Sequence, residues 1–186
     1  MDVSGILSIE DLKKAVIGGR NLKFVYFWQN EAGNDRNSKQ CLSQWFPAKF
    51  TKDGFTYNSA EQYMMAQKAR LFCDEEMFQR IIVEKQLKVI KECGRKVRNF
   101  NEEVWQKNRF QIVYDGNYAK FSQNEDLKQF LLSTNKKILM EASPYDKIWG
   151  IGIAESNPDI ENIKKWKGLN LLGFALMKVR NDLSKK

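Results

Sequence analysis

The chain has 186 residues, 42% of them hydrophobic and 12% aromatic, so it is long and apolar enough to bury the core of one domain. Its 31 Lys and Arg residues outnumber 23 Asp and Glu residues, and the net charge of +8 favours anionic partners such as phosphates, nucleotides or nucleic acid. With three cysteines and no histidine, the composition excludes histidine-based catalytic triads and a structural zinc site made of Cys and His alone.

The cysteines and the N-terminus indicate the compartment in which the protein works. Cys41, Cys73 and Cys93 are widely spaced and form no C-x-x-C pair, which favours free thiols in a reducing compartment. The N-terminus lacks the apolar run of a signal peptide, and no apolar stretch reaches the roughly 18 residues of a membrane span. We therefore expect a cytoplasmic protein without a membrane partner, and leave its oligomeric state open.

The first third of the chain contains one expected helix and three expected strands. Residues 8–17 have the pattern of a short amphipathic helix, with Ser8 as its N-cap and Gly18-Gly19 at its end, and we assign residues 1–22 to an accessory N-terminal helix. Residues 23–28 are aromatic and favour a strand, and residues 31–39 form a polar loop. Residues 44–50 and 54–58 predict two short strands joined by a turn at Asp53-Gly54.

Helices dominate the rest of the chain. The apolar periodicity predicts helices over residues 59–72, 74–93, 101–114 and 124–134, and an apolar 3–4 repeat predicts a packed helix over residues 171–183. Residues 137–142 favour a short buried strand, and residues 146–155 favour a loop that contains glycines. The sequence thus predicts an α+β, mainly helical fold: a multihelical single domain over residues 23–186, packed around a small β-sheet.

One pair of charged residues is a candidate wall of an active site. Ser59 and Gln62 have the spacing of a capping box, which places Glu61 in the first turn of a helix, near the positive end of the helix dipole. Lys68 lies seven residues further on, about two turns, so it shares a helix face with Glu61. The alternative is structural: Glu61 complements the dipole and Lys68 is solvated.

Two further segments carry residue types suited to a phosphorylated ring compound. Lys91, Arg95, Lys96 and Arg98 form a basic cluster suited to phosphate oxygens, although many such clusters are only solvated surface. Trp149 lies in the segment DKIWGIG, where Gly150 and Gly152 allow close approach of a ligand and Asp146 supplies an acid. An indole can stack on a base there, or it can fill the core.

Read in order, five segments between about Phe24 and Leu183 resemble the NADAR family of YbiA-like N-glycosidases. They are CLSQWFPAKF, GFTYNSAEQYMMAQKA, GRKVRNF followed by Trp105, the long segment from GNYAKF to KIWGIG, and WKGLNLLGFALMKVR. Several motifs in one order and at compatible spacing are far more specific than any single motif. The resemblance implies an enzyme that hydrolyses N-glycosidic bonds. We expect no cofactor, and the residue pattern implies no metal site.

The resemblance also implies the site residues. Glu61 stands where such proteins have their essential glutamate, and Asp146 is the second candidate catalytic carboxylate. The implied substrate-binding residues are Lys68, Arg95, Trp105, Trp149, Gly150 and Asn170. The sequence departs from the family pattern in two places: Gln44-Trp45-Phe46 replaces the commoner Asn-Phe-Tyr, and Gln62 stands where many members have His.

The chemistry of the bond agrees with these residues. Breaking a ribosyl C–N bond develops positive charge on the sugar carbon, so a fixed carboxylate such as Glu61 or Asp146 is stabilising, and the leaving nitrogen needs a proton from an acid or from water. The resemblance implies a phosphorylated ribosyl substrate as the partner: either ADP-ribosylated guanine, nucleotide-like or in nucleic acid, or a phosphoribosylamino pyrimidine of riboflavin synthesis. The alternative function is a non-catalytic nucleotide or nucleic-acid binding module, and an interaction protein with a basic surface is a weaker third.

Overall fold

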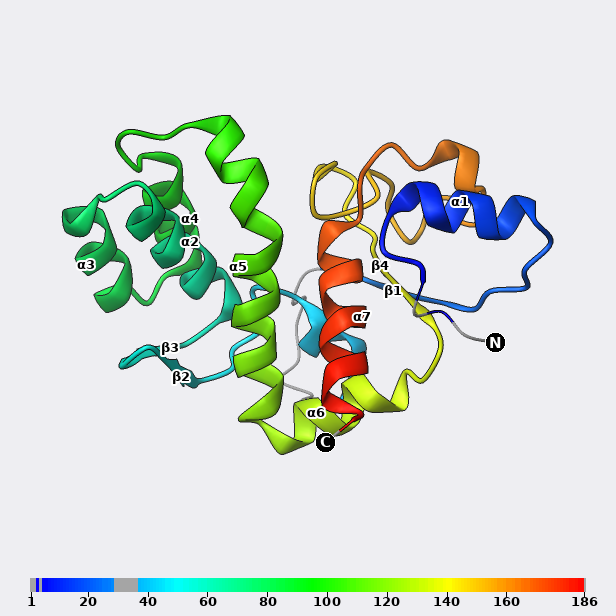
Figure 1. Cartoon of the computed structure of the whole chain (residues 1–186), viewed down its shortest axis with the longest axis horizontal. Helices are drawn as coiled ribbons and strands as arrows, with labels where there is room; N and C mark the ends of the chain where they lie inside the picture. Colours follow the sequence, from blue (N-terminus) through cyan, green and yellow to red (C-terminus); the bar gives the residue numbers. More distant parts are fainter. Residues whose placement is uncertain (1–2, 4, 29–36, 186) are drawn as a thin grey trace. The chain divides into compact units, whose positions relative to one another are not determined.

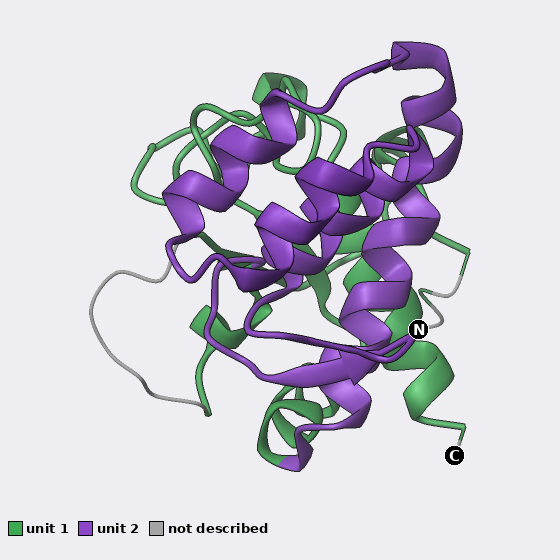
Figure 2. Ribbon diagram, turned by 90° about the vertical axis from the view of Figure 1, so that its left-hand side faces the viewer, with its two compact units in different colours: residues 1–43, 126–186 green, residues 44–125 purple. Residues whose placement is uncertain are grey.

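The computed structural model describes residues 3, 5–28 and 37–185, and part of the polar loop expected at residues 31–39 therefore lies outside the described residues. The predicted class is confirmed, because the described residues form a mainly helical α+β domain (Figure 1). Two short two-stranded sheets, rather than the single small sheet expected, accompany the helices. The chain divides into two compact units, residues 1–43 with 126–186 and residues 44–125 (Figure 2).

The unit of residues 44–125 contains a β-hairpin followed by four helices. Strands β2 (Phe50–Lys52) and β3 (Phe55–Tyr57) are antiparallel, with Phe50 opposite Tyr57. The turn between them has positive φ at Asp53 and Gly54, 52° and 79°, as a two-residue hairpin turn requires, which confirms the predicted turn. The first strand, predicted at residues 44–50, is misplaced, because residues 44–49 are not in a strand and β2 covers Phe50–Lys52.

The four helices of this unit are α2 (Ala60–Leu71), α3 (Glu75–Val83), α4 (Leu87–Arg95) and α5 (Glu102–Ser122). The single helix expected over residues 74–93 is wrong, because α3 ends at Val83 and α4 begins at Leu87. Glu84 accounts for the break, since its Oε1 accepts the N–H groups of Lys85 at 2.7 Å and Gln86 at 2.8 Å. These bonds replace the helical ones and allow the chain to turn.

Helix α5 extends eight residues beyond the end expected at residue 114, to Ser122. Gly116 lies inside it, and a Cβ atom there would come within 2.4 Å of the Tyr63 ring. The glycine thus allows α5 to lie against α2, and the packing offsets its low helix propensity. Tyr63 in turn makes an edge contact with Tyr57, their ring centroids 5.0 Å apart, so α2, α5 and the hairpin share one core.

The unit of residues 1–43 and 126–186 is built around a parallel strand pair. Its elements are α1 (Ile9–Ile17), β1 (Phe24–Phe27), the 3-10 helix η1 (Lys39–Leu42), α6 (Glu125–Ser133), β4 (Ile138–Glu141), the 3-10 helix η2 (Ile163–Lys165) and α7 (Leu171–Leu183). Strands β1 and β4 pair in parallel, and α7 packs against β4 (Figure 1). The predictions for α1, α6, β4 and α7 are confirmed, with Ser8 as the N-cap of α1.

Helix α7 approaches β4 more closely than ordinary side chains allow. A Cβ atom on Gly173 would lie 2.0 Å from the carbonyl oxygen of Leu139 in β4. Further along α7, the guanidinium Nη1 of Arg180 donates to Thr134 Oγ1 at 2.7 Å and to the carbonyl of Lys137 at 2.8 Å. The start of α7 and its last turns are thus both fastened to β4 and to the segment that leads into it.

Candidate functional site

The eight site residues expected from the sequence fall into two sets, one in each compact unit. Glu61, Lys68, Arg95 and Trp105 belong to the unit of residues 44–125, and Asp146, Trp149, Gly150 and Asn170 belong to the other unit. The residues of the first set lie on helices, whereas those of the second lie in the loop after β4 and at the start of α7.

Glu61 lies in the first turn of α2, as expected. Ser59 is the N-cap, and its Oγ accepts the N–H of Gln62 at 3.1 Å. The backbone N–H of Glu61 donates to the carbonyl of Gln44 at 2.9 Å, so the preceding segment closes the start of the helix. The Glu61 side chain is only 4% exposed. The result is a carboxyl group at the positive end of a helix whose first turn is fixed by hydrogen bonds.

Gln62, where many family members have His, serves the fold. Its side chain is fully buried; Oε1 accepts the N–H of Asn58 at 2.8 Å, in a variant of the expected capping box. Its Nε2 lies within 3.1 Å of three carbonyl oxygens, those of Ile81, Ile82 and Glu84, at the end of α3. Gln62 therefore joins the start of α2 to the end of α3, and its amide is fully used in doing so.

Lys68 lies on the same helix as Glu61, about 10 Å further along the axis at the helical rise. Its Nζ donates to the carbonyl of Gly94 at 2.8 Å and lies 4.2 Å from the ring centroid of Phe100 and 5.5 Å from that of Trp105. Burial lowers the pKa of Lys68, and the nearby carboxylate of Glu102 partly opposes this. The structure thus brings Lys68 and Trp105 together, an ammonium group above an indole that is 8% exposed.

The basic cluster expected near Arg95 does not act as one patch. Arg98 Nη2 is bound to Asp74 at 2.7 Å and to Glu76 at 3.1 Å, and the buried Asp74 also accepts the backbone N–H of Arg98. Lys91 Nζ lies 5.5 Å from the ring centroid of Trp45. Arg95 and Lys96 are exposed at the end of α4, next to Gly94, whose carbonyl holds Lys68. Arg98 is therefore structural, and Arg95 is the guanidinium of the cluster suited to an external anion.

A buried amide pair lies beside the segment that closes α2, and the sequence analysis did not single out its second member. Asn117 Nδ2 donates to Gln44 Oε1 and to the carbonyl of Val113, both at 2.8 Å. Gln44 is 8% exposed and Asn117 fully buried, yet Gln44 Nε2 and Asn117 Oδ1 have no hydrogen-bond partner within the described residues. One donor and one acceptor are thus available close to the backbone that binds Glu61.

Asp146 organises the loop after β4. Its Oδ1 accepts the N–H groups of Ile148 and Trp149, both at 2.8 Å, and its own N–H donates to Ser143 Oγ at 3.1 Å. The described residues provide no hydrogen bond to Oδ2, and the side chain is partly exposed. One oxygen therefore fixes the turn that carries Trp149, and the other is available to a ligand.

Gly150 is needed for close backbone packing in this loop. A Cβ atom there would lie 2.7 Å from the carbonyl oxygen of Glu141 and 3.0 Å from that of Asp146. The carbonyl of Gly150 accepts the N–H of Asn170 at 3.1 Å, and a Cβ on Gly168 would lie 2.1 Å from the same oxygen. Trp149, which is half-buried, is thus held in a segment with little freedom to move.

Asn170 is fully buried at the N-cap of α7, with a left-handed backbone at φ 54°. Its side-chain Oδ1 accepts the N–H of Glu141, and its Nδ2 donates to the carbonyl of Leu139, both at 2.9 Å. All the described hydrogen bonds of this amide go to β4. Contact with substrate stays a prediction for Asn170, whereas its role in fastening α7 to β4 is direct.

Tyr145, which the sequence analysis did not single out, is the most exposed large side chain of the loop, at 83%. It precedes Asp146, and its ring centroid lies 6.0 Å from that of Trp28. Exposed aromatic rings next to a carboxylate are suited to stacking on a planar base. The motif SPYDKIWGIG contained the signal, because a Tyr in a polar turn has no core to fill.

Among the described residues, no cluster of three or more His, Cys, Asp or Glu side chains is placed to hold a metal ion. None of the helices in the described part of the chain combines the length and apolar composition needed to cross a membrane.

Together, the fold and the two sets of residues define a mainly helical α+β protein with a nearly buried carboxyl group at a helix start and an Asp-organised aromatic loop. The sequence profile of the NADAR domain matches residues 26–184. The chain belongs to the NADAR domain family.

Several characterised proteins are similar to this chain. N-glycosidase R617 of Acanthamoeba polyphaga mimivirus is 47% identical over 166 residues, which cover 86% of this chain and 96% of that protein. N-glycosidase YbiA of Shigella boydii serotype 4 (strain Sb227) is 30% identical over 132 residues, which cover 71% of this chain and 74% of that protein. The chloroplastic riboflavin biosynthesis protein PYRR of Zea mays is 32% identical over 70% of this chain, but the match spans only 20% of that protein. The NMR structure of E. coli YbiA has the same fold, with a TM-score of 0.67 and 24% identity over 89% of both chains.

Proposed function

We propose that this chain hydrolyses the bond between a ribose carbon and the nitrogen of a base or amine, with a phosphorylated riboside as substrate, and that it does so in the cytoplasm. The chain is a hydrolase acting on N-glycosyl bonds, given its NADAR domain and its 47% identity to an N-glycosidase. We propose ADP-ribosyl-guanine or a phosphoribosylamino pyrimidine as the substrate. The relative named for riboflavin biosynthesis supports the second, and the charge of +8 suits both.

The observation that carries this proposal is the position of Glu61. Glu61 is only 4% exposed, and Ser59 and Gln44 close the helix turn in which it lies. Its carboxylate is therefore held in place before substrate arrives. Such a group stabilises the positive charge that develops on the sugar carbon and can orient the attacking water, at no cost of reorganisation during the reaction. We assign these two roles to Glu61.

Asp146 is the second proposed catalytic residue. Its Oδ1 is engaged with the backbone of Ile148 and Trp149, which leaves Oδ2 to face a ligand. A carboxyl group oriented in this way can deliver a proton to the leaving nitrogen directly or through a water molecule. The same side chain sets the position of Trp149, so that proton delivery and stacking on the base are coupled.

Recognition of the substrate is divided between aromatic and basic side chains. We propose that Trp105, Trp149 and Tyr145 offer faces for a planar base. Arg95, exposed at the end of α4, binds phosphate oxygens, because a guanidinium can donate two parallel hydrogen bonds to them. Lys68 adds positive charge, although its Nζ must share its hydrogen bonds between Gly94 and the phosphate. Gly150 and Asn170 act through the loop by fixing its backbone.

The test is release of free base or amine, measured by chromatography, from an ADP-ribosylated guanine oligonucleotide and from the phosphoribosylamino pyrimidine. The variants are Glu61→Gln, which keeps the size of the side chain, and Glu103→Gln, which makes the same change at an exposed position in the first turn of α5. We expect the wild type and Glu103→Gln to turn over one of the substrates, and Glu61→Gln to retain binding while its turnover falls at least about a hundredfold.

The same experiment identifies the alternative. The +8 charge and the aromatic residues also suit a binding module that does not turn over its ligand. Tight binding of either compound without release of base by the wild type would favour that module. Unchanged turnover in Glu61→Gln would refute the role given to the carboxylate.

A further inference from the structure

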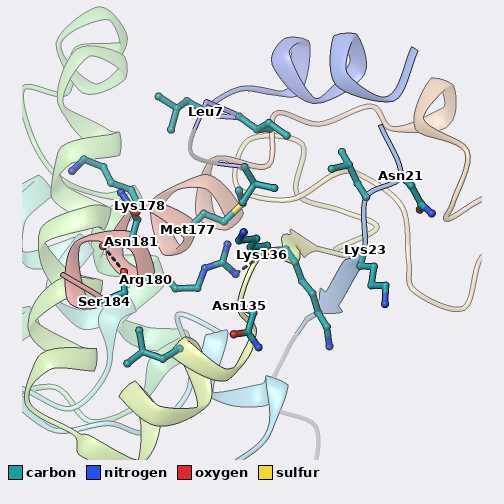
Figure 3. Close-up of a pocket in the computed structure, with 15 residues that line it drawn as sticks. Leu7, Asn21, Lys23, Asn135, Lys136, Met177, Lys178, Arg180, Asn181 and Ser184 are labelled. Carbon is teal, nitrogen blue, oxygen red and sulfur yellow. Dashed lines mark hydrogen bonds between the residues drawn. The ribbon is translucent and has the colours of Figure 1, made fainter. Parts of the chain in front are cut away.

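A cavity of about 690 Å³ lies entirely within the unit of residues 1–43 and 126–186, and its lining contains none of the eight expected site residues. The last turns of α7, the segment leading into β4 and the residues flanking α1 form its walls (Figure 3). Its volume is in the range of sites that hold small organic ligands.

The lining is strongly basic. Among the described residues that line it, five are cationic and none is Asp or Glu: Lys23, Lys136, Lys137, Lys178 and Arg180. Figure 3 shows Lys23, Lys136 and Arg180 among the side chains that line the pocket. Only Lys178 has a carboxylate partner within the described residues, because its Nζ binds Asp182 at 2.7 Å. Four cationic residues, none with a carboxylate partner among the described residues, thus line one cavity.

Arg180 is the buried charge at this site. The residue is 6% exposed, and within the described part of the chain its Nη1 donates to two neutral acceptors, the Thr134 hydroxyl and the Lys137 carbonyl. Burial lowers the pKa of Arg180 to about 10, so it stays protonated at neutral pH. A buried guanidinium without a carboxylate is costly to the fold, and an anion in the pocket would offset that cost.

The rest of the lining combines neutral polar residues with aliphatic ones. The aliphatic residues are Val3, Ile6, Leu7, Leu22, Leu132 and Met177. Leu7 is 57% exposed, which leaves apolar surface at the pocket in contact with solvent. An inorganic anion would leave this surface uncovered, whereas an anion with an apolar body would cover it.

We propose that this pocket is a second binding site, for a small organic anion that carries one phosphate or carboxylate group on an aliphatic body. The anionic group lies at Arg180 and Lys136, and the aliphatic body lies along Leu7 and Met177. The site is separate from the residues proposed for catalysis, and it holds its ligand without a chemical step.

The experiment is calorimetric titration of the full chain with octyl phosphate, octanoate, inorganic phosphate and the neutral octyl glucoside. Two variants alter exposed lining residues, Lys136→Glu and Leu7→Ser, and Lys88→Glu reverses an exposed charge outside the pocket. Because all three positions are exposed, none of the changes removes core packing. We expect one of the two octyl anions to bind, and the tighter of them to identify the anionic group.

We expect Lys136→Glu and Leu7→Ser each to weaken that binding about tenfold or more, and Lys88→Glu to leave it within about twofold. Inorganic phosphate should bind at least about tenfold more weakly, because it cannot use the aliphatic wall. Binding of octyl glucoside as tight as that of the octyl anions would overturn the proposal. So would wild-type affinity in Lys136→Glu and Leu7→Ser, or no binding of either octyl anion at millimolar concentration. None of these readouts depends on turnover, so the proposed function can fail or succeed independently.

Discussion

The side-chain Nε2 of Gln62, in the first turn of α2, donates to the carbonyl of Ile81, 19 residues further along, at 2.9 Å. The same nitrogen lies within 3.1 Å of the Ile82 and Glu84 carbonyls, so a single amide closes the end of α3. Helix ends leave carbonyl groups without partners, and a buried one is costly.

Gln62→Ala should therefore lower the free energy of unfolding by about 2–4 kcal/mol, since it creates a small cavity and leaves buried carbonyls without a donor. Gln62→His should cost less, because an imidazole N–H can serve one of these carbonyls. Urea unfolding followed by circular dichroism would measure both. Gln79→Ala, an exposed change that removes a bond to Glu75, is the control and should cost under about 0.5 kcal/mol. Equal effects of Gln79→Ala and Gln62→Ala would contradict this account.

Asp146 has two separable roles, and two substitutions distinguish them. Asp146→Asn keeps an oxygen for the N–H groups of Ile148 and Trp149 but removes the carboxylate, whereas Asp146→Ala removes both. We expect both variants to lose about a hundredfold or more in base release, and only Asp146→Ala to expose the two amides to rapid hydrogen exchange. Wild-type activity in Asp146→Asn would show that the carboxylate only shapes the loop.

Lys68 should give the protein a measurable dependence of stability on alkaline pH. Burial lowers the pKa of Lys68 in the folded state below its usual value of 10.5, so between these two pKa values the unfolded chain binds more protons. The free energy of unfolding contributed by this group must then rise with pH through that window. Tyr63, whose pKa burial raises, acts in the opposite direction above pH 10.

A comparison of variants isolates the contribution of Lys68. The difference in unfolding free energy between the wild type and Lys68→Met should shift in favour of the wild type as pH rises toward 10.5. Chemical denaturation at a series of pH values measures the difference. A flat difference would mean that the ammonium of Lys68 is as well solvated in the folded state as in the unfolded chain.

Gly173 should tolerate no side chain. A methyl group there would lie 2.0 Å from the Leu139 carbonyl oxygen and 2.4 Å from Asn170 Nδ2, so Gly173→Ala must push α7 away from β4. We expect a loss of about 3 kcal/mol or more, or failure to fold. Gly5→Ala is the matched control, because a Cβ at Gly5 has no atom within 4 Å. Comparison of the two melting temperatures is sufficient, and equal values would refute the close contact.

Tyr145 should matter for substrate and not for stability. Its side chain is 83% exposed, so Tyr145→Ala should change the unfolding free energy by less than about 0.5 kcal/mol. Loss of a stacking face should raise KM about tenfold, with a smaller change in kcat. Ile17→Ala, at a position 79% exposed in α1, is the control for removal of an exposed side chain. An unchanged KM would remove Tyr145 from the site.

The elements that the sequence predicted well are those whose limits are set locally. The hairpin turn follows from Asp53-Gly54 alone, and α7 was predicted at its observed ends because the apolar repeat stops where the helix stops. The break between α3 and α4 was missed, since the bonds that stabilise it come from the Glu84 side chain and from Gln62, a residue distant in sequence. The length of α5 was missed for the same kind of reason. A glycine such as Gly116 disfavours a helix, and its packing against Tyr63, which lets α5 continue, is visible only in the fold.

The candidate site shows the same division. Spacing placed Glu61 in the first turn of a helix, and the structure agrees. Spacing could not tell that Arg98 is bound to the buried Asp74, because the two residues are 24 positions apart, one in the turn after α4 and the other at the N-cap of α3. Nor could it reveal the Gln44–Asn117 amide pair, which joins residues 73 positions apart. Contacts of this range depend on the packed fold.

The order of the units along the chain affects how the protein is made. Strand β1 pairs with β4, so Phe24 needs Ile138 before it can complete its hydrogen bonds. At about 5–20 residues per second, a ribosome takes roughly 6–23 s to synthesise the segment between them. Residues 44–125 are synthesised as one continuous stretch during that interval, so every residue that contributes to the contacts within this unit is then present. The middle of the chain is therefore ready to fold first, and β1 stays without its partner until β4, at residues 138–141, has been made.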